Sequence, residues 1–249
     1  MKVLITGASS GLGREMARIL APKCEKMVLA ARSVERLEAL KTELSPFCPD
    51  VRVFAAELDK PENCYRLHEE HPDIDFLINN AGFGDFGEFT EGSLDKELLM
   101  IDTNVKALHI LMKLYLRDMV ARNEGRILNV ASIAAFMPGP LMATYYATKA
   151  YVMRLSEAVR KELKKKKSKV KISILCPGPV KTNFEVTANV GFNFRGQDCR
   201  KIAAYALKHL DRYYTVPTFP VRAGKFFLRL MPSRMATAVM YAVQSGRKE

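Results

Sequence analysis

The sequence has few cysteines and no long uncharged apolar run. Five cysteines occur at wide spacings and without a CxxC pair, which fits neither a disulfide framework nor a zinc site. We therefore expect a reduced, cytoplasmic setting and no bound metal. No uncharged stretch of about 18 apolar residues is present, so no transmembrane helix is expected. Met1 and Lys2 run directly into an apolar segment typical of a first strand, so no signal peptide is expected either.

Acidic residues are scarce relative to basic ones, and the formal net charge is +12. Much of the excess lies in residues 161–171, at the end of a predicted helix. Cations there complement the helix dipole, whereas a nucleic-acid site is the alternative explanation. No aromatic residue lies among these lysines, which disfavours stacking on bases. We predict a solvated helix end and no nucleic-acid partner.

Short apolar runs alternate with segments of helical spacing along most of the chain. The expected strands are 2–6, 26–31, 51–55, 75–79, 125–131, 169–175 and 213–216, and the expected helices are 11–21, 34–44, 62–70, 94–122, 144–166 and 202–210. This alternation predicts βαβ units around a parallel sheet. We expect a single Rossmann-like domain over residues 1–249, a three-layer α/β/α sandwich with a mainly parallel seven-stranded sheet.

A glycine-rich segment, TGASSGLG, connects the first strand to the first helix at residues 6–13. Glycines at this junction permit a sharp turn and let backbone N–H groups approach a pyrophosphate at the helix N-terminus. The spacing GxxxGxG differs from the GxGxxG of the usual dinucleotide fingerprint, and a purely structural turn is the alternative. The candidate cofactor-binding residues here are Gly7, Ser9, Ser10, Gly11, Leu12 and Gly13.

The second strand ends in Ala31 and Arg32, where NAD-binding sites usually carry an acidic residue. A guanidinium can pair bidentately with a 2′-phosphate, which favours NADP(H) as the cofactor. The alternative is a surface arginine that caps the following helix.

Tyr145 and Lys149 lie four residues apart on a predicted helix and so share one face. A nearby ammonium lowers the pKa of a phenol, which can then exchange a proton with a carbonyl or alcohol oxygen. Ser132 follows the fifth strand, at the edge where parallel sheets bind ligands, although a helix cap would also explain a serine there. Tyr146 lacks a lysine four residues later, so we expect it to pack or to line the substrate site.

These motifs together resemble the short-chain dehydrogenase/reductase family in its form of about 250 residues. The matching segments are TGASSGLG (6–13), NNAG (79–82), Asn104 in IDTNVKA, Ser132 in NVASIAA, YYATK (145–149) and PGPVKT (177–182). They occur in the family's order over about residues 2–182.

The resemblance implies a role for each matching residue of the catalytic group. Tyr145 would be the acid/base. Lys149 would hold the nicotinamide ribose and depress the tyrosine pKa. Ser132 would orient the substrate carbonyl, and Asn104 would help to position a water in a proton relay to Lys149.

The resemblance also implies further cofactor contacts. Asn80 and Gly82 would lie near the adenine-side ribose and the sheet core, and Val180 and Thr182 near the carboxamide and a phosphate. Glu57 and Leu58 stand where the family usually has Asp-Leu beside adenine. Ala81, Pro177 and Gly178 complete the expected set.

The region after Gly178 is where the family varies with substrate. Residues 183–201, with three phenylalanines, read as a lid over the substrate. The aromatic residues indicate an apolar substrate, or else they dock the lid. Residues 217–249 read as a helical tail that Pro232 divides. The tail would pack on the pocket or on a second subunit; contact with a membrane surface is possible for a basic amphipathic segment but is not favoured.

The predicted function is NADP(H)-dependent interconversion of a carbonyl, either ketone or aldehyde, and an alcohol. A non-catalytic NADP(H)-binding sensor and a membrane-surface reductase of a lipidic carbonyl are the alternatives. The two long predicted helices, 94–122 and 144–166, resemble the family's oligomer-forming helices, so a homodimer or homotetramer is expected.

Overall fold

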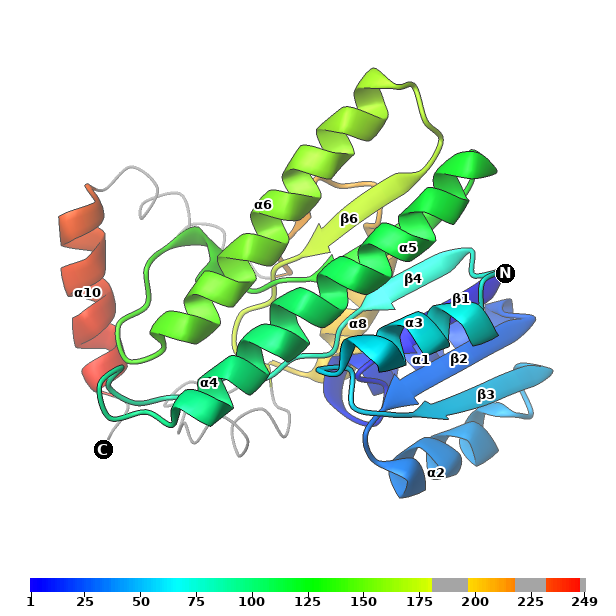
Figure 1. The fold of residues 1–249 in the computed structure, drawn as a ribbon, viewed down its shortest axis with the longest axis horizontal. Helices are drawn as coiled ribbons and strands as arrows, with labels where there is room; N and C mark the ends of the chain where they lie inside the picture. The colour runs from blue at the N-terminus through cyan, green and yellow to red at the C-terminus, as the bar shows by residue number, and fades with distance from the viewer. Residues whose placement is uncertain (181–196, 218–231, 247–249) are drawn as a thin grey trace.

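The computed structural model describes residues 1–180, 197–217 and 232–246 (Figure 1). The strands are β1 (Lys2–Thr6), β2 (Lys26–Ala31), β3 (Asp50–Ala55), β4 (Phe76–Asn79), β5 (Arg126–Val130), β6 (Lys171–Leu175) and β7 (Tyr214–Thr215). The α-helices are α1 (Gly11–Leu20), α2 (Val34–Leu44), α3 (Pro61–Glu70), α4 (Leu94–Ile101), α5 (Leu108–Ala121), α6 (Ala143–Lys165), α8 (Cys199–Lys208) and α10 (Ser233–Ser245).

The seven strands form one parallel sheet in the order β3-β2-β1-β4-β5-β6-β7. The central strands are almost wholly buried, which is why they read as continuous apolar runs in the sequence. The predicted sheet and its seventh strand are confirmed. The strand order reverses between β1 and β4, so the carboxyl ends of these two strands open a crevice in which such folds bind ligands.

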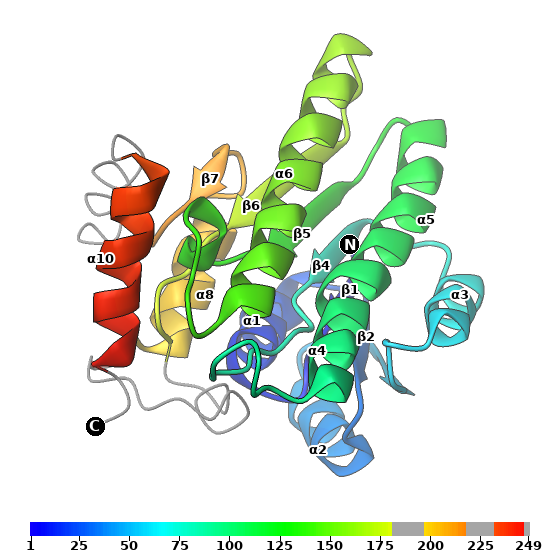
Figure 2. The same ribbon diagram turned by 60° about the vertical axis from the view of Figure 1, so that its left-hand side comes forward.

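Helices cover both faces of the sheet, as the alternating sequence predicted (Figures 1 and 2). One apolar core joins the sheet to α1, α2 and α8, through residues such as Met16, Leu40 and Ile202. A second core joins the other face to α3, α5 and α6, where Tyr115 and Met153 are fully buried. The helix α10 belongs to neither layer and lies beside the beginning of α6 in both views.

The predicted long helix 94–122 is interrupted, and this expectation was wrong in detail. A π-helical segment, Asp102–Ala107, separates α4 from α5. Such segments are rare, and they often occur at functional sites because the wider turn redirects side chains. Here Asn104 lies within the π segment and is buried.

Two other boundaries differ from expectation. Helix α8 begins at Cys199, within the predicted lid, and Gln197 forms a parallel bridge with Val180. The rest of the predicted lid, 183–196, lies outside the described residues. The tail is helical after Pro232, as expected, while residues 218–231 are also outside the described part of the chain.

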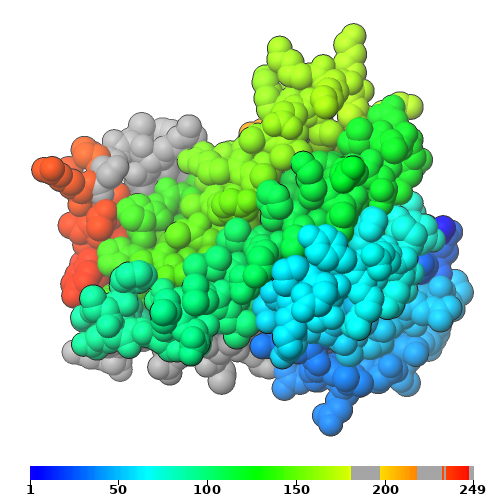
Figure 3. Space-filling model, in the orientation of Figure 1, coloured from blue at the N-terminus to red at the C-terminus, as the bar shows by residue number. Residues whose placement is uncertain are grey.

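The basic residues at the end of α6 are exposed, and this end projects beyond the rest of the molecule in Figure 3. Lys164 and Lys165 lie in the last turn, where positive charge complements the helix dipole. The arrangement agrees with a solvated helix end; the absence of a nucleic-acid partner stays a prediction.

Every helix within residues 1–180, 197–217 and 232–246 is too short or too polar to cross a lipid bilayer.

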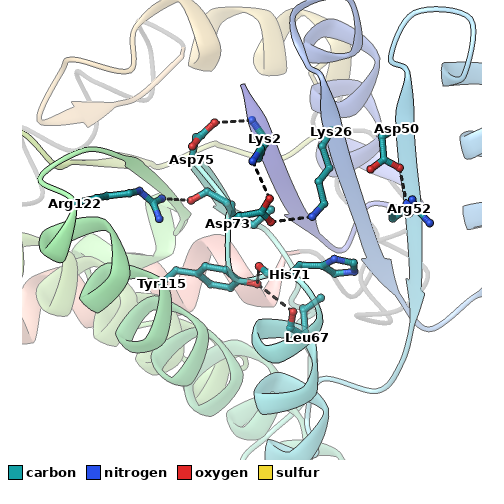
Figure 4. A network of polar contacts seen from close by, with 11 residues as sticks. Lys2, Lys26, Asp50, Arg52, Leu67, His71, Asp73, Asp75, Tyr115 and Arg122 are labelled. Atoms are coloured by element: carbon teal, nitrogen blue, oxygen red, sulfur yellow. Dashed lines mark hydrogen bonds and ion pairs between the residues drawn. The ribbon is translucent and has the colours of Figure 1, made fainter.

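A charged network joins the amino ends of the strands, opposite the crevice (Figure 4). The Asp73 carboxylate pairs with the ammonium groups of Lys2, at 2.9 Å, and Lys26, at 2.8 Å. The backbone N–H of Lys2 donates to Asp75 Oδ2 at 2.8 Å. Hydrogen bonds from Lys26 and Lys2 hold the pKa of Asp73 well below its usual range. This network therefore fixes the starts of β1 and β2 to the turn that precedes β4.

We predict that Asp73→Asn lowers the free energy of unfolding by about 1 kcal/mol at pH 7. Because the folded-state pKa of Asp73 is lowered, its contribution is fully present above the unfolded pKa of about 3.9 and is lost as the pH falls further. Urea unfolding at several pH values should show the variant and wild type converging below about pH 4. Asp50→Asn, which breaks the exposed pair with Arg52, is the control and should change stability less. A difference that stays constant down to pH 2 would contradict this account.

Candidate active site

The described residues line a cavity of about 400 Å³ at the carboxyl edge of the sheet. It extends from the glycine-rich loop after β1, past the ends of β2 and β4, to the start of α6. Sixteen of the predicted site residues line it: Gly7, Ser9, Ser10, Gly11, Leu12, Arg32, Leu58, Asn80, Ala81, Gly82, Ser132, Tyr145, Lys149, Pro177, Gly178 and Val180. A cavity of this size, with polar groups gathered in one part, is typical of a small-molecule site.

The glycine-rich loop has the geometry of an anion cradle. Gly7 and Gly11 have φ angles of +65° and +55°, a conformation that side chains disfavour. A Cβ on Gly13 would lie 2.4 Å from the carbonyl oxygen of Gly7, so α1 packs directly against the loop. Ser10 makes no side-chain hydrogen bond to the helix, and the first turn of α1 has no acidic residue. The positive end of α1 is therefore directed at the cavity and is neutralised by neither a cap nor an acidic residue in its first turn.

Thr6 and Asn80 tie this loop to the end of β4. The Thr6 hydroxyl oxygen accepts hydrogen bonds from the N–H groups of Asn80 and Ala81, both at 3.0 Å. The side-chain amide of Asn80 donates to the carbonyl groups of Thr6, at 3.1 Å, and Gly7, at 3.2 Å. Asn80 thus holds the shape of the loop in addition to lining the cavity. Thr6 was not among the predicted site residues, although it opens the glycine motif.

Two exposed arginines stand at the end of the cavity near β2. Arg32 was expected there, whereas Arg36, one helical turn later on α2, was not. Its place in the first turn of the helix that follows Arg32 was the available signal. The two guanidinium groups give this end of the cavity a positive charge that suits a phosphate.

Glu57 does not line the cavity, in contrast to its neighbour Leu58. Its carboxylate is exposed and pairs with Lys60 at 2.6 Å, and this hydrogen bond lowers its pKa. Asp59 lines the cavity instead. The Glu57 side chain therefore does not lie where the expected contact with adenine would require it.

Tyr145 lies at the start of α6, half-buried and close to Ser132. Burial raises the pKa of Tyr145 to about 12, while a hydrogen bond from Ser132 acts in the opposite direction. Ser132 Oγ also accepts the N–H of Ala134 at 3.1 Å. The Ser132 hydroxyl therefore lies between the backbone of Ala134 and the phenol of Tyr145, and both residues line the cavity.

Lys149 lies below the face of the Tyr145 ring, with its Nζ 5.9 Å from the ring centroid. It is 5% exposed, and its Nζ donates to the carbonyl of Val130 at 3.0 Å. Burial lowers the pKa of Lys149 to about 8. The expected lowering of the Tyr145 pKa by this ammonium is not found, because the Nζ points at Val130 and the loss of hydration dominates at the phenol.

Asn104 is buried behind the cavity wall and does not line it. Its side chain exchanges two hydrogen bonds with the backbone of Phe83, at 2.8 and 3.0 Å, and donates to Thr148 at 3.1 Å. A Cβ on Gly82 would lie 2.7 Å from Asn104 Oδ1 and 3.3 Å from the Nζ of Lys149. The side chain of Asn104 is thus used to hold the loop after β4 and α6 at their closest approach.

A chain of buried polar groups positions α6 against the sheet. Asn79 donates to Asn129 at 2.9 Å, and Asn129 donates to Ser156 on α6 at 2.8 Å. Ser156 in turn donates to the carbonyl of Val152 at 2.6 Å. These groups link β4, β5 and α6 within the core, so the helix that bears Tyr145 and Lys149 has a fixed register on the strands.

Of the remaining predicted residues, Thr182 lies outside the described part of the chain. The cavity also contacts residues that the sequence did not single out, including Phe83, Thr103, Ile133 and Met142. They line the cavity because of how the loops meet in space, and no local sequence pattern indicates this.

Comparison with known proteins places this geometry in a family. The short chain dehydrogenase model matches residues 1–191. An uncharacterized oxidoreductase of Mycobacterium tuberculosis is 35% identical over 195 residues, which are 75% of each chain. The chain therefore belongs to the short-chain dehydrogenase family, whose members are nicotinamide-dependent oxidoreductases.

Solved structures agree with this assignment. A short-chain dehydrogenase from Sphingobium yanoikuyae in complex with NADPH is 29% identical, with 91% of both chains covered and a TM-score of 0.83. A short-chain dehydrogenase/reductase from Burkholderia phymatum in complex with NAD is 24% identical and has the same fold, with a TM-score of 0.81 over 90% of this chain and 92% of that one. Similar folds thus carry either nicotinamide cofactor.

We predict that Lys149→Met stabilises the protein, by roughly 1–3 kcal/mol at pH 7, because it removes a buried ammonium whose pKa is lowered by burial. Above pH 8 the unfolded lysine retains a proton that the folded one has lost, so wild-type stability rises with pH. The advantage of the variant should therefore shrink between about pH 8 and pH 10.4 in urea unfolding. Lys161→Met, an exposed change on the same helix, is the control. A variant less stable than wild type at pH 7 would contradict this account.

Proposed function

We propose that the protein is an NADP(H)-dependent oxidoreductase that interconverts a ketone or aldehyde and the matching alcohol, with Tyr145 as acid/base. The observation that carries the proposal is the single cavity that joins the glycine-rich loop to Ser132, Tyr145 and Lys149. One part of this cavity suits a dinucleotide, and the other brings a phenol, a hydroxyl and an ammonium together.

The residues present fit a nicotinamide dinucleotide. The glycine cradle and the N-terminus of α1 would hold the pyrophosphate, and Leu58 would lie near the adenine. Lys149 would bind the nicotinamide ribose, with Pro177, Gly178 and Val180 around the nicotinamide end. When bound, the cofactor supplies or accepts a hydride at the carbonyl carbon.

The positive end of the cavity supports NADP(H) over NAD(H). Arg32 and Arg36 are both exposed there, and each can give charge-assisted hydrogen bonds to a 2′-phosphate. NAD-binding sites of this fold instead carry an acidic residue at the end of the second strand, where this chain has Ala31 and Arg32.

The protein's own groups handle the proton. The high pKa of Tyr145 keeps its phenol protonated near neutral pH, so that it donates to a carbonyl oxygen during reduction. Ser132 donates a hydrogen bond to the same oxygen and stabilises the charge that develops on it. The buried Lys149, with its pKa near 8, lies where it could replace the proton that Tyr145 gives up. Whether Asn104 helps to hold a relay water stays a prediction.

The arrangement of whole molecules is also part of the proposal. We expect a homodimer or homotetramer built on α5 and α6, a cytoplasmic setting and an apolar substrate. A lid formed by residues 183–201 and contacts of Thr182 with the nicotinamide carboxamide and a nearby phosphate belong to the same expectation.

Tyr145→Phe should lower kcat/KM for ketone reduction by at least about a hundredfold, because the proton donor is lost. NADPH oxidation followed by absorbance, over a panel of ketones and aldehydes, measures this. Tyr151→Phe removes an exposed hydroxyl on the same helix, one that contacts His109, and should leave turnover near wild type. Equal turnover by wild type and Tyr145→Phe would refute the assigned role, and tight NADPH binding without any turnover would favour a sensor.

Arg32→Ala and Arg36→Ala should each weaken NADPH binding by about tenfold or more, while NADH binding changes little. The reason is that the guanidinium groups would contact the 2′-phosphate, which NADH lacks. Fluorescence titration with both cofactors measures the two dissociation constants. Lys41→Ala, a partly exposed change near the end of α2, is the matched control. An equal loss of affinity for both cofactors would show that the arginines do not read the 2′-phosphate.

A further inference from the structure

The helix α10 contacts the active-site wall through a buried hydrogen bond. Gln244 Nε2 donates to the hydroxyl oxygen of Tyr146 at 2.9 Å, across a separation of 98 residues in the chain. Gln244 is 0% exposed and Tyr146 is 8% exposed. A buried amide loses its hydrogen bonds to water and recovers only those that it forms within the protein. An apolar side chain at this position would therefore bury α10 at a lower cost in desolvation free energy. The amide instead forms a directional hydrogen bond, which constrains where the Tyr146 hydroxyl lies.

The Tyr146 ring is held on its other sides as well. A Cβ on Gly139 would lie 2.2 Å from the ring Cγ, which shows that the ring rests directly on the backbone there. Met240 of α10, Met142 and Ala134 pack with the ring in a small apolar cluster. The backbone N–H of Tyr146 donates to Met142 at 3.0 Å. The position of the ring therefore depends on α10 on one side and on the Gly139 turn on the other.

The same ring faces the catalytic group. Tyr146 lines the active-site cavity together with Tyr145, and the two rings are 6.1 Å apart at an angle of 78°. Ala134 and Met142 line the cavity beside Tyr146. A carbonyl oxygen that reaches Tyr145 thus brings one of the substituents on its carbonyl carbon toward an apolar wall whose position is set from α10.

We infer that Gln244 and Tyr146 together determine which carbonyl substrates the enzyme accepts. Gln244 is a positioning residue that fixes the Tyr146 ring, and the ring limits the substituent beside the carbonyl to a small apolar group. This inference rests on the proposed function. It adds that α10, through Tyr146, limits the size of one substituent on the substrate carbonyl. It also assigns α10 a role in substrate specificity, although this helix lies far from Tyr145 in the sequence.

The test compares Gln244→Leu, Tyr146→Phe and the double variant with wild type. Steady-state reduction of acetone, pentan-3-one and heptan-4-one with NADPH gives kcat/KM for symmetric ketones, whose two substituents grow together, so that one of them always meets the Tyr146 wall. Each single variant should raise the ratio for heptan-4-one over acetone by roughly threefold or more, mainly through KM, because the ring loses its hydrogen bond to α10 and can shift. The double variant should match the single ones, since each change removes the same hydrogen bond between Gln244 and Tyr146.

Two further variants sharpen the comparison. Tyr146→Ala removes the wall itself and should raise the same ratio by about tenfold or more. Ser245→Ala, which removes a hydroxyl contact to Ala242 one residue along α10, should leave the ratio unchanged. If Gln244→Leu does not fold, Tyr146→Phe removes the hydrogen bond while α10 stays intact. Unchanged ratios in Gln244→Leu and Tyr146→Phe, with turnover retained, would overturn the inference and leave the proposed function standing.

A measurement without turnover separates the two proposals. Hydrogen exchange should increase in peptides covering residues 133–146 when Gln244 is replaced by Leu, because α10 no longer holds Tyr146. Unchanged exchange there would overturn the inference whatever the activity. Failure of wild type to reduce any ketone or aldehyde, together with increased exchange in the variant, would refute the proposed function and keep the contact from α10 to the cavity wall.

Discussion

A lysine ammonium buried at the carboxyl edge of the sheet is the group around which the site is organised. Lys149 has lost nearly all its hydration and keeps a hydrogen bond to the carbonyl of Val130. Charge in such a place is costly, and burial lowers the pKa of Lys149 for the same reason. The loop after β4 passes close to the Nζ at Gly82, where a side chain would collide with Asn104 Oδ1. The amide of Asn104 then holds that loop in place from behind.

The amino edge of the sheet carries stabilising ion pairs, whereas the carboxyl edge carries the candidate active site. At the amino edge, Asp73 forms strong, partly exposed ion pairs with Lys2 and Lys26 that close the starts of neighbouring strands. At the carboxyl edge, polar groups are instead left directed into a cavity, and Lys149 is held at a cost. Proteins commonly accept such unfavourable groups at functional sites and recover stability elsewhere.

The parallel sheet and much of the site could be predicted from the sequence because both follow local rules. Strands buried on both faces read as apolar runs, and the carboxyl ends of parallel strands share an edge. Residues placed just after strands, such as Gly7, Asn80 and Ser132, therefore had to gather. The expectations that failed depend on how side chains are placed in the folded molecule, which the motifs do not specify. The sign of the Tyr145 pKa shift follows from burial by loops, and Glu57 turns outward to a lysine three residues away. The contact from Gln244 to Tyr146 spans 98 residues and has no sequence pattern.

The π-helical segment 102–107 also escaped prediction, since apolar spacing across 94–122 is compatible with one continuous helix. Its presence has a consequence for how the chain length can vary here. In a regular helix each residue added or removed rotates all that follows by about 100° about the axis. The wider turn places Asn104 behind the cavity while α5 still buries Tyr115 and Met119 against the sheet. After the loss of one residue in this segment, Asn104 and the buried residues of α5 could no longer both point toward their present partners. An alignment of related chains should therefore show no gap between Asp102 and Ala107, even where the residues themselves differ.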